Sequence, residues 1–164
     1  MADKSSFTPD EWALLLESVM MAGIAVSAAE PSGLWGMLKE SFSSSSELVR
    51  GRNAENPLIK AVVADFGTSE GRSAARDGLK GKLAKAKPAE IVARCIETLQ
   101  RAGAVVDAKA PDDALAFKNW LRQISDQAAQ ASKEGGFLGV GGVPVSEAEK
   151  ATLAQISNAL RLPA

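Results

Sequence analysis

Four glutamates beside two glycine-containing turns are the residues of this sequence whose chemistry is most readily stated. They are Glu30, Glu134, Glu147 and Glu149. Carboxylate oxygens are the ligands that Ca²⁺ and Mg²⁺ prefer, so these residues predict a divalent-cation site if the two turns meet. The alternative is structural: Glu147 and Glu149 complete the start of a helix capped by Ser146, while Glu30 and Glu134 face solvent. We favour the structural alternative.

A glycine-rich segment, residues 133–145, contains five glycines within eight residues. No Lys followed by Ser or Thr comes after them, which excludes a phosphate-binding P-loop. A dinucleotide-binding turn would need a preceding strand and a third spaced glycine, and a predicted helix stands there instead. Backbone amides at the start of the last helix could hold an anion, but Glu147 and Glu149 already occupy that end. We therefore interpret the segment as a loop between two helices.

Basic side chains recur on one side of a predicted polar helix that is capped by Ser69 and continues to about residue 86. They are Arg72, Arg76, Lys80 and Lys87. Such a stripe could contact the phosphates of a nucleic acid. No aromatic residue is interleaved for base stacking. A solvated helix face is the favoured interpretation, and nucleic-acid binding is disfavoured.

Catalytic constellations are missing from the sequence. It contains no His, which removes the commonest general base and the commonest transition-metal ligand. The single cysteine, Cys95, cannot form an internal disulfide, and it falls on the apolar stripe of a predicted helix. A packed small side chain is therefore expected there, and the protein is predicted not to be an enzyme.

The segments that carry these candidate residues are predicted to be mostly helical. The composition is rich in Ala and lacks Tyr, which favours helix over sheet. Helix starts are predicted at Pro9, Pro57, Pro88, Pro111 and Ser146, each with a capping residue or an initial proline. The fold class predicted is all-α: a compact single domain over residues 1–164 with six to eight helices, a flexible leader over residues 1–6, and the glycine-rich loop at 133–145.

Apolar periodicity assigns roles to several helices. Residues 88–109 are expected to form a central core helix, and residues 111–131 to bury a face that includes Leu115 and Phe117. A further helix is expected over residues 32–42. The three tryptophans, Trp12, Trp35 and Trp120, should supply core bulk.

Charge is distributed unevenly along the chain. Residues 1–49 carry two basic and seven acidic side chains, whereas residues 50–101 carry eleven basic and six acidic ones. The basic third is expected to face the acidic first third, in preference to an acidic partner. The apolar run 18–29 has acidic flanks unlike a signal peptide and is too short to span a bilayer. A soluble, cytoplasmic protein without membrane contact is predicted.

Two helix ends look alike. Residues 26–36 and residues 129–139 both pass from small helical residues to Glu, then Gly, then bulky apolar residues. With Ala128 to Glu134, the stretch Val145 to Glu149, and the closing Leu153, Ile156 and Leu160, this pattern resembles the tellurite-resistance TerB-like family of bacterial helical domains. The family usually has Asp-Gly in these loops and is linked to metal ions. The resemblance implies an all-helical bacterial domain with a stress-related role.

Three functional hypotheses follow. The leading one is a non-catalytic domain acting through protein contacts, either with an unidentified protein or with a second copy of itself. The first alternative is sensing of a divalent metal ion or an anion through the acidic and glycine loops, with Ca or Mg as the only cofactors considered. The second is weak nucleic-acid binding through residues 72–87.

Overall fold

The protein is described from a computed structural model, which places residues 2–29, 46–134 and 145–163. These residues form a bundle of seven α-helices and one short 3-10 helix, with no strand among them, which confirms the all-α prediction. In chain order the elements are η1 (Lys4–Ser6), α1 (Pro9–Ala29), α3 (Ser46–Arg52), α4 (Pro57–Phe66), α5 (Ser69–Leu83), α6 (Pro88–Lys109), α7 (Pro111–Glu134) and α8 (Glu147–Ala159).

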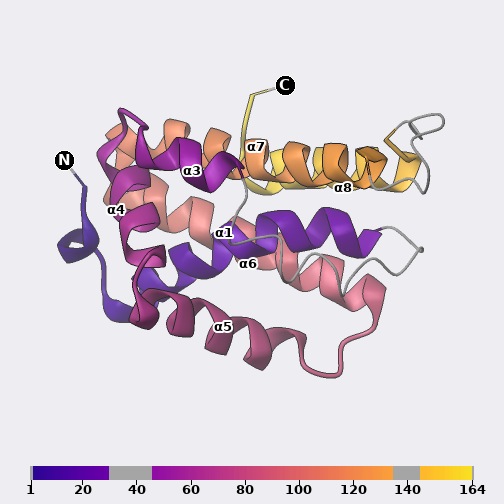
Figure 1. Cartoon of the computed structure of the whole chain (residues 1–164), viewed down its shortest axis with the longest axis horizontal. Helices are drawn as coiled ribbons and strands as arrows, with labels where there is room; N and C mark the ends of the chain where they lie inside the picture. Colours follow the sequence, from indigo (N-terminus) through magenta and orange to yellow (C-terminus); the bar gives the residue numbers. More distant parts are fainter. Residues whose placement is uncertain (1, 30–45, 135–144, 164) are drawn as a thin grey trace.

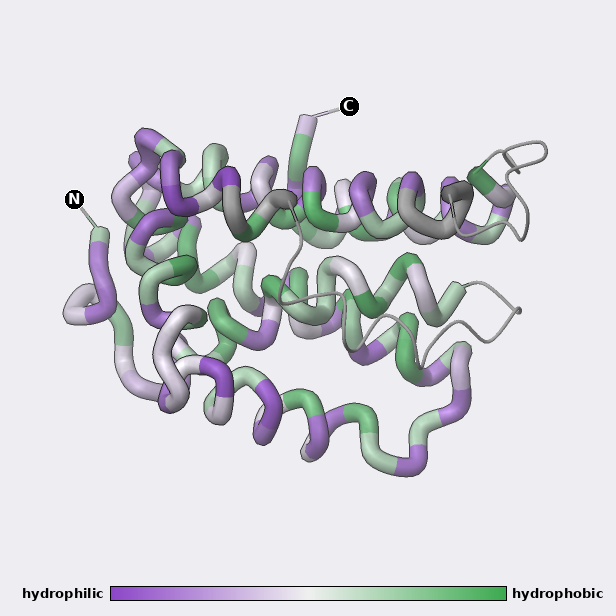
Figure 2. Tube along the Cα trace, viewed as in Figure 1, coloured by the Kyte–Doolittle hydropathy of each residue, from purple (hydrophilic) through white to green (hydrophobic). Residues whose placement is uncertain are grey.

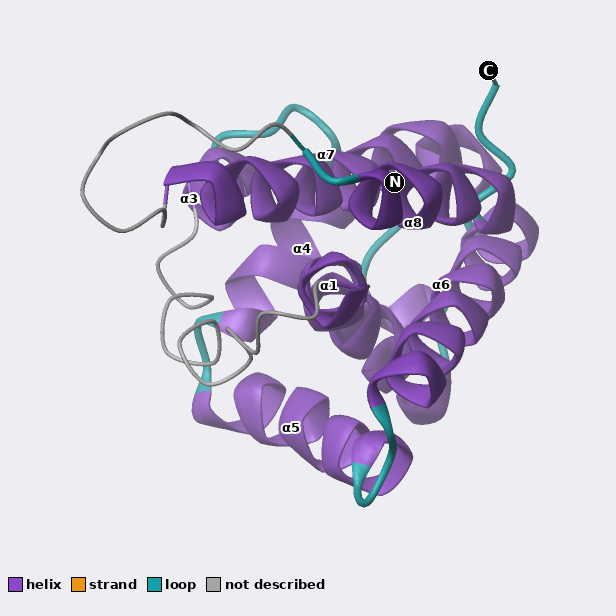
Figure 3. Ribbon diagram, turned by 90° about the vertical axis from the view of Figure 1, so that its right-hand side faces the viewer, coloured by secondary structure: helices purple, strands orange, loops and turns teal. Residues whose placement is uncertain are grey.

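Helix α1 lies at the centre of the bundle. Figure 3 views it end-on, with α7 and α8 on one side, α6 on another and α5 opposite, and α1 contacts all four of these helices. Helix α6 packs directly against α1, and Figure 1 shows α6 running beside it. The apolar stripe of α6 is buried in the core, as expected for residues 88–109, and α1 is the helix that the others surround.

The apolar run 18–29 is the second half of a longer apolar helix, α1. Residues 18–29 alone are too short to cross a bilayer, but the whole helix of 21 residues is long and apolar enough to do so by length and composition. In this bundle 67% of its apolar window is buried. Its hydrophobicity therefore matches the role of a helix surrounded by others.

Local sequence signals set most helix starts. The backbone N–H of Thr8 donates to the Glu11 carboxylate at 2.8 Å, and the N–H of Glu11 donates to Thr8 Oγ1 at 3.2 Å, forming a capping box at the helix start predicted at Pro9. The rings of Phe7 and Trp12 pack across this box with centroids 5.7 Å apart. Asn56 caps α4, and prolines occupy the first positions of α4, α6 and α7 as predicted.

The segment predicted to be a flexible leader makes contacts with the bundle. Ala2 is buried, and its backbone N–H donates to Asp113 at 3.2 Å. Asp113 also accepts from the side chain of Asn56 at 2.9 Å, so one buried carboxylate joins the N-terminal segment, α4 and α7. Residues 2–6 therefore pack on the bundle because a buried carboxylate needs hydrogen-bond donors.

Several predicted boundaries need correction. Thr68, not Ser69, caps α5, since its hydroxyl accepts from the backbone N–H of Gly71 at 3.0 Å. Helix α7 continues to Glu134, so the first two residues of the expected loop at 133–145 are helical. Leu115 was expected on the buried face and is instead 54% exposed. The helix expected over 32–42, Trp35 and the five glycines of the loop lie outside the described residues.

Candidate functional site

Two members of the predicted acidic set serve as helix-start residues. Glu149 is buried, and its carboxylate accepts from the backbone N–H of Ser146 at 2.9 Å. Glu147 is exposed and pairs with Lys150 at 2.8 Å. Both observations fit the structural alternative for this pair.

The other two predicted ligands do not complete a site among the described residues. Glu134 is the last residue of α7, and Glu30 lies outside the described residues. Within residues 2–29, 46–134 and 145–163 no group of three or more Cys, Asp or Glu side chains could hold a metal ion. A Ca²⁺ or Mg²⁺ site therefore stays a prediction.

The predicted basic stripe lies on the outer face of α5. Arg72, Arg76 and Lys80 are exposed on this helix, and Lys87 is exposed just before α6. Figure 2 shows hydrophilic residues recurring along α5. Arg72 already donates to the backbone carbonyl of Gly67 at 2.9 Å, which satisfies the end of α4. The stripe is thus solvated, and one of its four members has a structural role.

A basic residue that the stripe omitted meets the acidic first third of the chain. Lys82 forms an ion pair with Glu17 of α1, whose side chain is only 9% exposed. A Cβ at Gly78 would approach Glu17 Oε1 to 2.0 Å, so the absent side chain of Gly78 leaves the room for this carboxylate. This pair supports the expectation that the basic third faces the chain's own acids.

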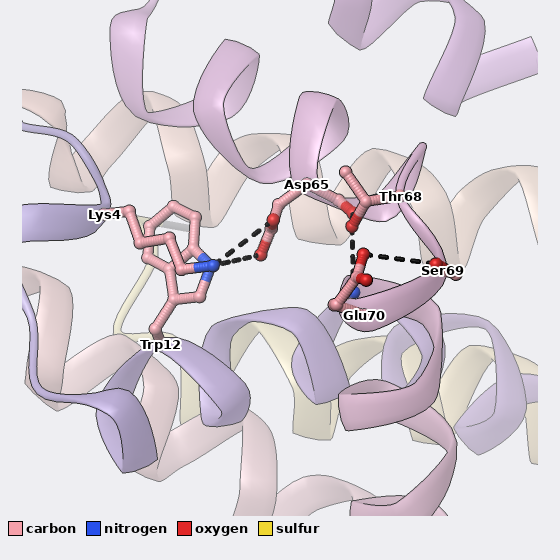
Figure 4. A network of polar contacts seen from close by, with 7 residues as sticks. Lys4, Trp12, Asp65, Thr68, Ser69 and Glu70 are labelled. Atoms are coloured by element: carbon pink, nitrogen blue, oxygen red, sulfur yellow. Dashed lines mark hydrogen bonds and ion pairs between the residues drawn. The ribbon is translucent and has the colours of Figure 1, made fainter.

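A polar network ties the N-terminal segment to the start of α5, as Figure 4 shows. The carboxylate of Asp65 accepts from the indole N–H of Trp12 at 2.7 Å and pairs with Lys4 at 3.2 Å. Thr68 continues the network by donating to the backbone carbonyl of Asp65 at 2.7 Å. These contacts link the N-terminal segment, α1, the end of α4 and the start of α5.

The only thiol is inert. Cys95 is fully buried, and its S–H donates to Met21 Sδ at 3.3 Å. Burial raises the pKa of this thiol to about 12, which keeps it protonated at neutral pH. Because the thiolate is the nucleophile, Cys95 is a packed side chain, as predicted.

A groove of about 570 Å³ opens between α3 and α7. Its lining residues come from α3, the loop after it, α4 and α7: Arg50, Gly51, Ala54, Ile59, Ala116, Asn119, Trp120, Gln123, Asp126, Gln127 and Gln130. Gly51 brings α3 close, since a Cβ there would lie 2.7 Å from Val63 and 3.2 Å from the Trp120 ring. The close approach of these helices places an indole at the groove floor.

The chemistry of the groove is apolar at its floor and amide-rich at its rim. Ala54, Ile59 and Trp120 supply the apolar surface. Asn119, Gln123 and Gln130 project into the groove from α7, and none of the three forms a hydrogen bond to another described residue. An amide both donates and accepts. This site was not predicted from the sequence, although amides at positions 119, 123, 127 and 130 follow helical spacing.

A smaller pocket of about 400 Å³ lies between α5 and α6. It is lined by Gly81, Lys82, Arg94, Glu97, Thr98 and Arg101. Arg94, Thr98 and Arg101 are spaced four and three residues apart, which places them on one face of α6. That spacing is visible in the sequence, but its position opposite the end of α5 is not.

Comparisons with known proteins give no information about the function of the site. No protein-family model, no curated protein and no solved structure matches this chain. The TerB-like resemblance therefore stays an expectation. The class defined by the described residues is a helical bundle with a polar-rimmed groove.

Proposed function

We propose that this protein is a non-catalytic binding module whose α3–α7 groove receives a polypeptide segment of a partner protein. The observation that carries the proposal is the groove itself: an apolar floor containing Trp120, bordered by the amides of Asn119, Gln123 and Gln130, which form no hydrogen bond to another described residue. Concave sites of this kind, with a few convergent polar groups, are the usual form of a binding site.

The groove chemistry specifies the partner segment. An apolar side chain of the partner would rest on Ala54 and on the small accessible parts of Ile59 and Trp120, which are 5% and 4% exposed. Partner backbone N–H and C=O groups would meet Asn119 and Gln123, because amides serve both as donors and as acceptors. Arg50 and Asp126 place one charge of each sign at the rim, so the segment should be close to neutral.

The exposed side chain of Leu115 supports a partner-binding role for this part of α7. It is the one large hydrophobic residue of the described chain that is strongly exposed, at 54%. It lies one helical turn before Asn119, and Asn119 lines the groove. A partner that covers the amides would also cover Leu115. The soluble, cytoplasmic setting and the stress-related role implied by the TerB-like resemblance are part of this proposal.

Site-specific photo-crosslinking in cells tests the proposal. A benzoyl-phenylalanine at Asn119 should yield a discrete protein adduct, whereas the same group at exposed Ser73 on α5 should not. Adding Gln123→Arg, which fills the groove from an exposed position, should remove the Asn119 adduct. A second copy of the chain in the adduct would identify the partner as homo-oligomeric. Identical adducts from Asn119 and Ser73, or none from Asn119, would contradict the proposal.

A further inference from the structure

The pocket between α5 and α6 gathers positive charge from two helices. Lys82 comes from the last turn of α5, and Arg94 and Arg101 come from one face of α6. One acid, Glu97, shares the lining, and Glu17 of α1 pairs with Lys82. Three cations therefore face two carboxylates, and the pocket keeps an excess of positive charge.

The two arginines are presented differently. Arg94 is half-buried and donates to the backbone carbonyl of Lys82, which fixes its guanidinium beside the pocket. Arg101 is exposed and makes no hydrogen bond or ion pair with any other described residue. A guanidinium carries five N–H donors in a planar fork that matches the oxygens of a phosphoryl group. Arg94 and Arg101 together therefore have more N–H donors than the described residues accept, and the remaining donors are available to a ligand.

Thr98 lines the pocket between the two arginines. The residue is 2% exposed, and its hydroxyl forms no hydrogen bond with any residue in the described part of the chain. This hydroxyl is not among the buried polar atoms that lack a partner, so its oxygen faces the water of the pocket. A ligand oxygen in the pocket would replace that water and accept from the hydroxyl.

We propose that this pocket binds the phosphoryl group of a small phosphorylated molecule, with Arg94, Thr98 and Arg101 as its ligands on the protein. Gly81 leaves the entrance open, since a Cβ built there would meet nothing within 4 Å. Glu97 accepts a hydrogen bond from a hydroxyl or amine on the body of the same molecule. The site lies on other helices than the α3–α7 groove and does not depend on the function proposed for that groove.

A small molecule fits this pocket better than a nucleic acid. The lining contains no aromatic ring for base stacking. Along the chain from residue 69 to 101, Glu70, Asp77, Glu90 and Glu97 interrupt the basic residues, which weakens a continuous contact with a phosphate backbone. The positive charge is concentrated at the pocket, where one phosphoryl group meets several donors.

Calorimetric titration with inorganic phosphate and with glycerol phosphate, at constant ionic strength in chloride, tests the proposal. Saturable binding is expected for both ligands, tighter for glycerol phosphate if Glu97 contacts its hydroxyls. Arg101→Gln should weaken binding by about tenfold to a hundredfold, because it removes charge-assisted hydrogen bonds. Gly81→Leu should abolish binding by filling the entrance, and Thr98→Val should weaken it while preserving shape.

Arg76→Gln is the matched control, since it removes one exposed positive charge from α5 outside the pocket. Binding should be unchanged in this variant, and thermal melts of each protein confirm that it folds. Equal weakening by Arg76→Gln and Arg101→Gln would overturn the site in favour of diffuse charge. Absence of saturable phosphate binding, retention of binding by Gly81→Leu, or binding of single-stranded DNA but neither phosphate ligand would each overturn it as well.

Discussion

The two sides of α1 are held in different ways. Toward α6 and α7 the bundle packs large apolar side chains, including Leu99, Phe117 and Leu121, all fully buried. On the α5 side the buried residues of the neighbouring helix are small, Gly71 and Ala75, and the polar link is the Glu17–Lys82 pair. The contacts of α1 with α6 and α7 depend on large buried apolar side chains. The contact of α1 with α5 depends on small residues, which let the helices lie close together, and on one ion pair.

This difference separates the two candidate surfaces. The α3–α7 groove is built on α7, whose inner face is anchored in the apolar core. The α5–α6 pocket lies at the margin of α5, and one of its residues, Lys82, also links α5 to α1. Ligand binding at the pocket should therefore stabilise the packing of α5, whereas a partner in the groove should leave α5 unaffected.

The largest effect is expected on the apolar side. Phe117→Ala should lower the free energy of unfolding by about 3–5 kcal/mol, because it removes a fully buried ring and leaves a cavity. Denaturant unfolding followed by circular dichroism measures the change. Leu115→Ala, two positions away and exposed, is the control and should change stability by less than about 0.5 kcal/mol. Equal losses would contradict the assignment of the two faces of α7.

At α5, a larger side chain should lower the stability of the protein. A Cβ at Gly71 would lie 2.0 Å from the backbone carbonyl oxygen of Asp65 at the end of α4, so Gly71→Ala should cost about 1–3 kcal/mol by pushing the start of α5 away from α4. Gly81→Ala, on the same helix, meets open space and should stabilise by about 0.5–1 kcal/mol, since Ala is the better helix former. If both substitutions stabilise the protein, α5 does not lie as close to the end of α4 as the structure places it.

Cys95 offers a pH-dependent test of the apolar side, because it faces Met21 of α1. Its pKa is raised to about 12 in the folded protein, above the value of about 8.5 for an exposed thiol. Below about pH 8.5 both states are protonated and stability is unaffected. As pH rises further the unfolded thiol ionises first, so the thiol should lower stability by about 1–2 kcal/mol at pH 10.

The measurement is the difference between wild type and Cys95→Ala across pH 7 to about 10.5, which cancels the titration of other groups. The wild type should lose stability relative to the variant as pH rises. A constant difference would show that the thiol is not held in an apolar site.

The smallest effect is expected at the turn that follows α5. Lys85 has a φ of 59°, in the left-handed region that glycine adopts without strain. Lys85→Gly should raise the unfolding free energy by about 1 kcal/mol, since it relieves this conformation just after the helix end. Thermal melting is sufficient to detect the gain. Lys87→Gly, at a position with negative φ, should bring no such gain.

Helix starts could be predicted because their signals are local. The prolines at 57, 88 and 111, and the Ser146 to Glu149 capping box, act within one turn of the chain. The order of packing could not be predicted in this way. Residues 88–109 carry a regular apolar stripe, but the helix surrounded on all sides is α1, whose buried residues occupy most of its circumference.

The binding surfaces depend on contacts between distant segments. Leu115 fits an apolar spacing on α7, yet no helix covers it, and its exposure is a property of the assembled bundle. Arg94, Thr98 and Arg101 follow helical spacing in the sequence. Their chemistry becomes a pocket only because Gly81 and Lys82 lie across from them in the fold. The spacing of residues in a sequence predicts the faces of a single helix. A groove also depends on how two helices pack together, which that spacing does not predict.

The most direct test of the groove is the dissociation constant of the polypeptide recovered from the Asn119 adduct, measured with purified wild type, Gln123→Arg and Arg101→Gln. Gln123→Arg should weaken binding by about tenfold or more, because it places bulk and charge in the groove. Arg101→Gln lies in the other pocket and should leave the constant unchanged. An unchanged constant in Gln123→Arg, or equal weakening in both variants, would contradict a polypeptide site between α3 and α7.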